Sequence, residues 1–229
     1  MKRRTLLLGG IGAAAVGGAL VWRPTDKGAP HNAYFAEFNR MLKREGPGKP
    51  VMLIDKARLD HNIDLIAGSV GENKTYRVVV KSLPSIELVS YIMARANTRS
   101  LMLFHQPFIN LVASRIADAD VLIGKPMPVQ AARTFYRKLD AAGDFNPERQ
   151  LQWLIDSPDR LLQYQALARE LKVKMRVNFE LDVGLHRGGF ESTQHFRDSL
   201  EVIKDDQEHL SFAGFMGYEP HLTGTQAAL

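Results

Sequence analysis

Residues 76–93 read YRVVVKSLPSIELVSYIM, and this stretch holds the two patterns that decide the fold. The β-branched run at 76–80 predicts a buried strand. Apolar residues then recur at the spacing of one helix face, at Leu88, Val89, Ile92 and Met93. The stretch therefore predicts a strand followed by a helix, with Lys81 directly at the carboxyl end of the strand.

The same alternation of strand and helix continues to the end of the chain. Further apolar runs predict strands at 101–104, 121–123, 151–155, 174–181 and 210–216. Their nearly continuous apolar character is typical of strands that are covered on both faces. This rhythm predicts βα units in a parallel sheet. It fits a closed barrel and an open doubly wound sheet equally, and does not distinguish them.

The barrel interpretation carries an expectation about completeness. An eight-unit barrel needs about 250 residues, whereas six strands fit between residue 76 and the last residue, Leu229. The ending HLTGTQAAL shows no pattern that would terminate a fold. We therefore expect an incomplete barrel with about six of its eight units.

The segment ahead of the barrel divides into three parts. Residues 25–50 predict a polar linker with a short helix at 33–44, which the sequence GPGKP at 46–50 ends. The apolar run VMLI at 51–54 predicts a further short strand. Leu59, Ile63 and Ile66 then predict a helix.

The first 24 residues read MKRRTLLLGGIGAAAVGGALVWRP and have the layout of an export signal. The pair Arg3-Arg4 followed by three leucines resembles a twin-arginine signal. The alternative is a membrane anchor, since the apolar run 6–22 is at the lower edge of spanning length. We expect export to the periplasm, with the signal either cleaved or retained at the inner membrane.

Composition excludes several classes of function. The net charge is +5, and Lys and Arg are scattered without the basic, aromatic-rich stripe of a nucleic-acid-binding protein. The chain has no cysteine, which excludes disulfides, zinc–thiolate sites and cysteine nucleophiles. A hydrophobic content of 45% is that of an ordinary globular protein.

Lys81 is the first candidate for chemistry. Ligands bind at the carboxyl ends of the strands in parallel β/α folds. Partial desolvation there favours the neutral amine, which attacks an aldehyde to form a Schiff base. The alternative is a lysine that merely extends from a strand end into solvent.

Two later segments also place polar groups after strands. Residues 178–190, NFELDVGLHRGGF, run into a glycine-rich loop in which Arg187 offers planar donors to a phenolate or carboxylate. Residues 215–221, FMGYEPH, place Tyr218 where it could stack on a flat ring or transfer a proton. An ordinary charged loop and a packing tyrosine are the alternatives.

Together the three segments resemble the fold-type III pyridoxal-phosphate (PLP) family, which includes alanine racemase, D-threonine aldolase and D-serine dehydratase. VVVKSLPSIELVSYI resembles the family's first barrel strand with its PLP lysine, and FELDVGLHRGGF and GFMGYEPH resemble two later strand ends. The resemblance covers about residues 50–222. Three features resemble the aldolase and dehydratase branch more than alanine racemase. They are the sequence Ser-Leu-Pro-Ser after Lys81, Tyr218 in place of a histidine, and residues 154–157.

The resemblance implies a TIM-type (β/α)8 barrel of the alanine racemase type over residues 51–229, truncated and without its C-terminal β-domain. Lys81 would be the PLP anchor and proton-transfer base, Arg187 would bond the phenolic oxygen, and Tyr218 would lie against the ring. His105 and Asp156 are further candidates for the cofactor pocket. His221 would contact the residues of the pocket without touching the cofactor itself. A divalent metal site belongs to the absent domain, so no metal ligand is named in this chain.

The function that the resemblance implies is that of a lyase or racemase acting on D-amino acids or β-hydroxy-D-amino acids through the Lys81 Schiff base. A non-catalytic PLP carrier of the same barrel type is the alternative, and a barrel hydrolase or binding protein unrelated to PLP is a third. The expected partners are a small amino acid, the membrane only through the N-terminal signal, and a second copy in a full-length homodimer. The truncated chain itself is expected to have little activity.

Overall fold

The structure is a computed structural model that describes residues 28–82 and 84–222. It separates into two units, residues 1–54 and residues 55–229. The predicted export signal at 1–24 lies outside the described residues, so its expected role stays a prediction. Within the described ranges, every helix is too short or too polar to cross a bilayer.

The first unit contains one described helix, α2 (Ala33–Glu45). Asn32 caps its start, and its side chain accepts a hydrogen bond of 3.1 Å from the amide of Phe35. The strand expected at 51–54 is wrong, because these residues are exposed coil in the described structure. An apolar run becomes a strand only where a neighbour satisfies its amides and carbonyls, and the described chain provides none there.

The second unit is built on a parallel sheet. In the described residues its strands are β1 (Val78–Val79), β2 (Ser100–Leu103), β3 (Asp120–Ile123), β4 (Leu151–Ile155), β5 (Met175–Leu181) and β6 (Leu210–Gly217). The helices are α3 (Lys56–Gly68), α4 (Ile86–Arg95), α5 (Gln106–Arg115), α6 (Val129–Lys138), α7 (Pro147–Gln150), α8 (Pro158–Leu171) and α9 (Thr193–Asp205). The short α7 lacked a periodic signal in the sequence.

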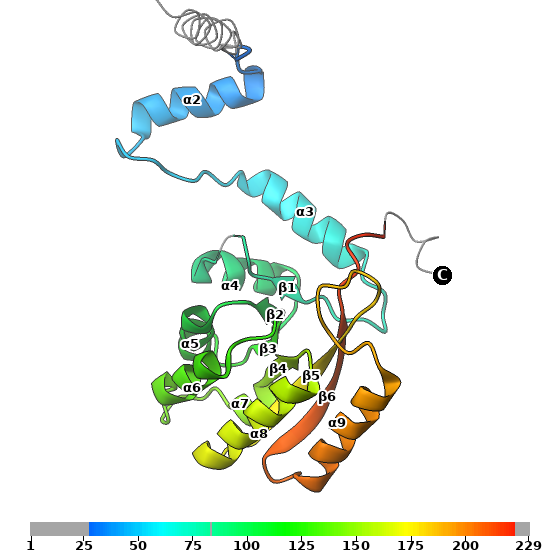
Figure 1. The fold of residues 1–229 in the computed structure, drawn as a ribbon. Coiled ribbons are helices and arrows are strands. Elements are labelled where there is room, and N and C mark those ends of the chain that lie inside the picture. The colour runs from blue at the N-terminus through cyan, green and yellow to red at the C-terminus, as the bar shows by residue number, and fades with distance from the viewer. Residues whose placement is uncertain (1–27, 83, 223–229) are drawn as a thin grey trace, which may run out of the picture. The chain divides into compact units, whose positions relative to one another are not determined.

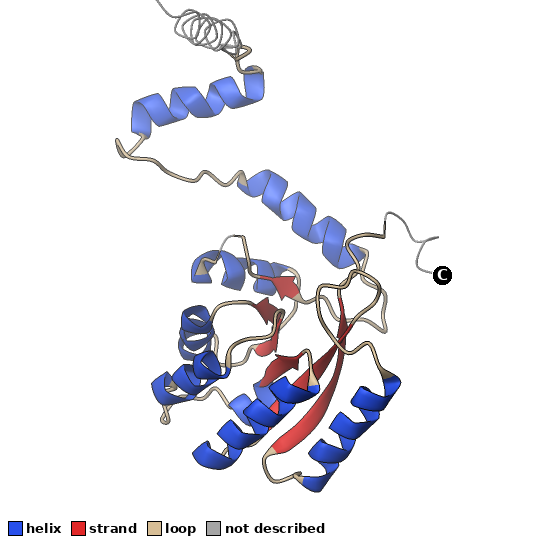
Figure 2. Ribbon diagram, in the orientation of Figure 1, coloured by secondary structure: helices blue, strands red, loops and turns tan. Residues whose placement is uncertain are grey.

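Strand order decides between the two architectures that the sequence left open. The described strands pair in the order β1-β2-β3-β4-β5-β6, each parallel to the next (Figure 1). A doubly wound sheet reverses its order part-way, whereas unbroken order with right-handed crossovers places all connecting helices on one face. The helices α4, α5, α6, α8 and α9 form such an outer layer (Figure 2). The barrel prediction is confirmed, and the sheet is not closed between β1 and β6.

The outer face of the sheet carries the hydrophobic core. Trp153 on β4 is fully buried and lies 5.7 Å, centroid to centroid, from both Phe135 of α6 and Tyr164 of α8. Its indole Nε1 donates to the hydroxyl of Tyr136 at 3.2 Å, so the one polar atom of the ring is satisfied. Burial of this aromatic group holds β4 against two helices.

The inner face of the sheet carries a row of polar side chains, which the apolar runs of the strands did not predict. Arg77 forms an ion pair with Asp120 and donates to the Leu101 carbonyl at 2.9 Å. Gln152 donates to Asp120 at 3.2 Å, and Asn178 donates to Gln152 at 3.2 Å. A hydrogen-bonded polar row therefore crosses the inner face from Arg77 to Asn178, whereas Val79 on the inner face of β1 is 55% exposed.

Replacing Trp153 by Ala should strongly destabilise the second unit. Large-to-small substitution of a buried aromatic costs about 3–5 kcal/mol, because the neighbours cannot fill the cavity. Urea unfolding followed by circular dichroism measures the change. The control is Leu162→Ala on α8, where the leucine is 50% exposed and we expect a change within about 0.5 kcal/mol. Equal losses in the two variants would contradict the packing described.

Candidate functional site at the carboxyl ends of the strands

Lys81 lies on the inner side of the sheet, at its carboxyl rim. Val78 and Val80 are buried in the hydrophobic core, so the residues that alternate with them face the other way. Arg77, two positions before Val79, reaches across the inner face to Asp120. Lys81 follows in the same alternation, two positions after Val79. The amine is therefore not on the outer wall of the barrel.

Phe104 is the aromatic neighbour of Lys81. The Lys81 Nζ lies 5.6 Å from the centroid of the Phe104 ring, within cation–π range. Lys81 itself is exposed, and so is Val79 behind it at 55%. The expectation of a partly desolvated amine is therefore not met in the described structure, because the inner face beside β1 is open.

Gly124 makes room for the Phe104 ring. A Cβ at this position would lie 2.4 Å from the ring and 2.7 Å from Cγ of Met102. Any side chain at 124 would thus displace the Phe104 ring from its present position. Neither residue was recognised in the sequence. The alternation of side chains along β2 would have placed Phe104, two residues after Met102, on the inner face.

Arg187 is held between a carboxylate and an aromatic ring. Its guanidinium forms an ion pair with Glu180 of β5, whose side chain is only 4% exposed. Its Cζ lies 4.2 Å from the centroid of the Tyr218 ring, which follows β6. The structure thus brings together two of the predicted site residues, Arg187 and Tyr218, at the same rim as Lys81. Glu180 was not recognised in the sequence, although a charge within an apolar strand is a usable signal.

Hydrogen bonds hold both ends of the loop that carries Arg187. The Asp182 carboxylate accepts amide hydrogen bonds from Gly184 at 2.9 Å and His186 at 3.0 Å, and contacts the His186 ring nitrogen Nδ1 at 2.7 Å. The Gly184 amide, then the His186 amide, lower the pKa of Asp182, although burial opposes the shift. The Phe190 amide donates to the Glu180 carbonyl at 2.7 Å, which returns the chain to β5.

Gly189 permits this return. Its φ of 110° lies in a region that favours glycine. A Cβ there would lie 2.8 Å from both the Asp182 nitrogen and the Glu180 carbonyl oxygen. A glycine is therefore required both by conformation and by space, and the position of Arg187 depends on it.

The remaining predicted residues lie at the same end of the strands without joining this group. His105 is exposed at the N-cap of α5 and makes no side-chain capping bond there in the described structure. Asp156 follows β4, and its Oδ1 lies 3.7 Å from Nε of Arg160. Its buried Oδ1 has no hydrogen-bond partner among the described residues. His221 approaches the Arg187 loop, since a Cβ on Gly184 would be 3.5 Å from its Nε2.

One group in the described residues has the ligand types for a metal ion. Potential ligand atoms of Asp182, His186 and Glu191 lie within 4.8 Å of one another. Both oxygens of Asp182 are already engaged by the loop itself. This geometry explains how the loop is held, and we assign no metal to it.

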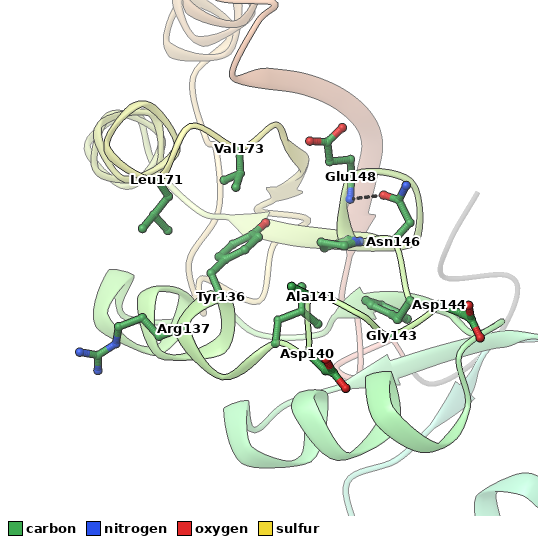
Figure 3. Close-up of a pocket in the computed structure, with 13 residues that line it drawn as sticks. Tyr136, Arg137, Asp140, Ala141, Gly143, Asp144, Asn146, Glu148, Leu171 and Val173 are labelled. Atoms are coloured by element: carbon green, nitrogen blue, oxygen red, sulfur yellow. Dashed lines mark hydrogen bonds between the residues drawn. The ribbon is translucent and has the colours of Figure 1, made fainter.

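A separate hollow of about 670 Å³ lies at the opposite, amino end of β4 and β5 (Figure 3). It is lined by the end of α6, the loop to α7 and the residues before β5, and the hydroxyl of Tyr136 is buried beside it. Burial raises the pKa of Tyr136 well above its ordinary value. No predicted site residue lines this hollow, and in barrel folds the amino end serves stability.

Fold and site together define a parallel β/α-barrel protein with a lysine at the carboxyl rim of its strands. The sequence matches the family described as alanine racemase, N-terminal domain, over residues 54–228. The chain therefore belongs to this family of fold-type III PLP proteins. No curated protein sequence matches it.

Three solved structures illustrate the similarity of fold. A mutant of D-threo-3-hydroxyaspartate dehydratase has a TM-score of 0.64 and 16% identity, covering 81% of this chain and 47% of that one. Alanine racemase from Bacillus anthracis with bound L-Ala-P has a TM-score of 0.59 and 15% identity, covering 79% and 46%. Histidine racemase from Leuconostoc mesenteroides subsp. sake has a TM-score of 0.58 and 12% identity, covering 76% and 44%. The chain spans less than half the length of each.

Glu180→Gln should loosen Arg187. The substitution keeps the side-chain shape but removes the charge that pairs with the guanidinium, which should lower the unfolding free energy by about 1–3 kcal/mol. It should also speed the modification of Arg187 by phenylglyoxal, as measured by peptide mapping. Glu191→Gln, an exposed position near the same loop, is the matched control and should change neither. Indistinguishable behaviour of the two variants would rule out an orienting role for Glu180.

Protonation of Asp182 at low pH should break the hydrogen bonds that hold the loop. Because the folded-state pKa is lowered, their stabilisation is complete above the carboxyl's ordinary value of 3.8 and is lost as pH falls through the lowered value. The amide NMR shifts of Gly184 and His186 should titrate with a midpoint below 3.8. Asp182→Asn should remove this titration. A midpoint at or above the ordinary value would contradict the hydrogen bonds described.

Proposed function

We propose that this chain carries the PLP-binding lysine of an enzyme acting on D-amino acids or β-hydroxy-D-amino acids. One observation carries the proposal: Lys81 stands at the inner carboxyl rim of a racemase-type barrel sheet, the rim at which Arg187 and Tyr218 form a contact of 4.2 Å. Family membership supports it, because fold-type III proteins of this family bind PLP.

The residues at this rim fit the chemical features of PLP. An aldehyde needs a primary amine, and Lys81 offers one that is accessible. A phenolic oxygen needs a fixed cationic donor, and the buried Glu180 carboxylate holds the Arg187 guanidinium in place. A flat heteroaromatic ring needs an aromatic face, and Tyr218 is 42% exposed there.

The roles of the residues follow from these positions. When bound, PLP supplies an electron sink for the α-carbon of an amino acid. Lys81 would hold the cofactor and would act as the proton-transfer base through Nζ. Arg187 orients the ring through its planar N–H groups, and Glu180 prevents the guanidinium from swinging away from Tyr218. Glu180 is thus a positioning residue, while Lys81, Arg187 and Tyr218 are the groups proposed to touch the cofactor or substrate.

The aldolase and dehydratase branch is the finer proposal. Ser82 and the residues after it, together with Tyr218, support this branch over alanine racemase itself. The similarity of fold to a hydroxyaspartate dehydratase agrees with it. Since this chain spans less than half of such enzymes, the bond that is broken, a homodimeric state and export by residues 1–24 are proposals about the whole protein.

Incubation with PLP should attach the cofactor to Lys81. We expect an absorbance band at longer wavelength than free PLP that borohydride fixes, with the label recovered on the peptide containing Lys81. Lys81→Ala should abolish the label. Lys125→Ala is the matched control, because Lys125 is also exposed and follows a strand, β3, but comes directly after the inward Gly124. A label at Lys125 would overturn the assignment.

Turnover of a D-amino acid distinguishes an enzyme from a PLP carrier. In deuterium oxide, NMR should detect one of three outcomes for an enzyme of the proposed class: deuterium at the α-carbon of the substrate, cleavage of D-threonine to glycine and acetaldehyde, or conversion of D-serine to pyruvate and ammonia. A carrier should bind PLP at Lys81 and give none of the three. Labelling without any of these changes in the full-length protein would therefore support the carrier and contradict the proposed lyase or racemase.

A further inference from the structure

Asp182 and His186 form a carboxylate–imidazole pair on the inner side of the carboxyl rim. Asn178 of β5 belongs to the polar row of the inner face, so the alternation of side chains places Glu180 and Asp182 on the same side. Oδ2 of Asp182 lies 2.7 Å from Nδ1 of His186. The imidazole is therefore held on the side of the sheet where Glu180 pairs with Arg187.

The bonding of Asp182 determines which ring nitrogen of His186 is free. The Gly184 amide, then the His186 amide, lower the pKa of the Asp182 carboxyl, so it is ionised at neutral pH. An ionised carboxylate only accepts hydrogen bonds, so Nδ1 of His186 carries the hydrogen. In the neutral ring Nε2 is then an acceptor. The Asp182 side chain is 3% exposed and that of His186 is 78% exposed, so Nε2 is accessible to a ligand.

The backbone conformation of His186 indicates that this orientation is imposed by the loop. Its φ of 55° lies in the left-handed region, which is uncommon for residues other than glycine. Such conformations persist where the surroundings hold them, and they are concentrated at functional sites. The Asp182 carboxylate holds both the amide and the ring of His186. The imidazole thus keeps one orientation beside Arg187.

The proposed role of Arg187 relates His186 to the substrate. In PLP, the phenolic oxygen and the aldehyde lie on neighbouring ring carbons. In the proposed site Arg187 bonds this oxygen, while Lys81, and later the amino acid, is joined to the aldehyde carbon. His186 directly precedes Arg187 in the chain. We therefore expect its imidazole on the side of the cofactor where the substituents of the α-carbon lie.

We propose that His186 is a second proton-transfer residue, which removes the proton from the side-chain hydroxyl of a β-hydroxy-D-amino acid. This inference rests on the proposed PLP site and narrows its reaction to cleavage of the Cα–Cβ bond. Nε2 takes the hydroxyl proton, and the O–H electron pair forms the carbonyl of the released aldehyde. The electron pair of the Cα–Cβ bond stays with the α-carbon, which takes up a proton to give glycine, and His186 releases its own proton to solvent.

The pairing with Asp182 favours cleavage over dehydration. An acceptor at Nε2 removes a proton from the hydroxyl group, whereas departure of that group as water needs a proton donor at the same place. Asp182 is a positioning residue, because it acts on the reaction only by fixing the tautomer and the orientation of His186.

The tautomer of His186 can be measured in the full chain without cofactor or substrate. Imidazole nitrogen NMR shifts at mildly alkaline pH should show the hydrogen on Nδ1. Asp182→Asn should weaken this preference, because an amide can donate as well as accept. A neutral His186 ring with its hydrogen on Nε2 in the unsubstituted chain would overturn the proposal.

Removal of the imidazole tests the reaction in the full-length protein. His186→Gly suits the left-handed backbone at this position, so the loop should be retained. Cleavage of D-threonine should fall about 10²–10⁴-fold and recover in part with added imidazole, whereas borohydride labelling of Lys81 should be unchanged. The matched control is His195→Gln, an exposed histidine on α9, which should leave cleavage as it was.

The outcomes separate this inference from the proposed function. Cleavage that survives His186→Gly, or a loss that imidazole does not restore, would overturn the role of His186 while Lys81 stays labelled. Exchange of the α-hydrogen of D-threonine without cleavage in the unsubstituted protein would do the same. Failure to label Lys81 in the unsubstituted protein would contradict both proposals.

Discussion

The strict alternation of side chains along parallel strands is the constraint on which the rest of the structure depends. Each strand must send one set of side chains to the helices and the other set to the barrel interior. Trp153 satisfies the first demand with a buried aromatic cluster. Asp120 and Gln152 satisfy the second with hydrogen bonds between strands. Lys81 and Tyr218 lie on the inner side of the carboxyl rim because their strands follow the same alternation.

The sequence predicted the elements of the barrel unit well, because apolar runs indicate buried strands and apolar residues three or four positions apart indicate the buried face of a helix. Strand order, and hence the choice of a barrel, needed the register between strands, which no local pattern contains. The run at 51–54 shows the opposite failure, since apolar residues predicted a strand where the described chain offers no pairing partner. Strand propensity is realised only through neighbours.

The sequence indicated the candidate residues of the site and not the residues that support them. Position and charge suggested Lys81 and Arg187, whereas Glu180 and Gly124 could be recognised only from their distances to other side chains. The Cβ that Gly124 lacks would collide with Phe104, a fact that belongs to packing between two strands.

A crystal structure of the chain with PLP would show directly whether Lys81 carries the cofactor. We expect density that is continuous from Nζ of Lys81 into the cofactor, with the Arg187 guanidinium within hydrogen-bond reach of its ring oxygen and still paired with Glu180. Density joined to another lysine, or a Lys81 side chain packed outward among Val78 and Val80, would contradict it.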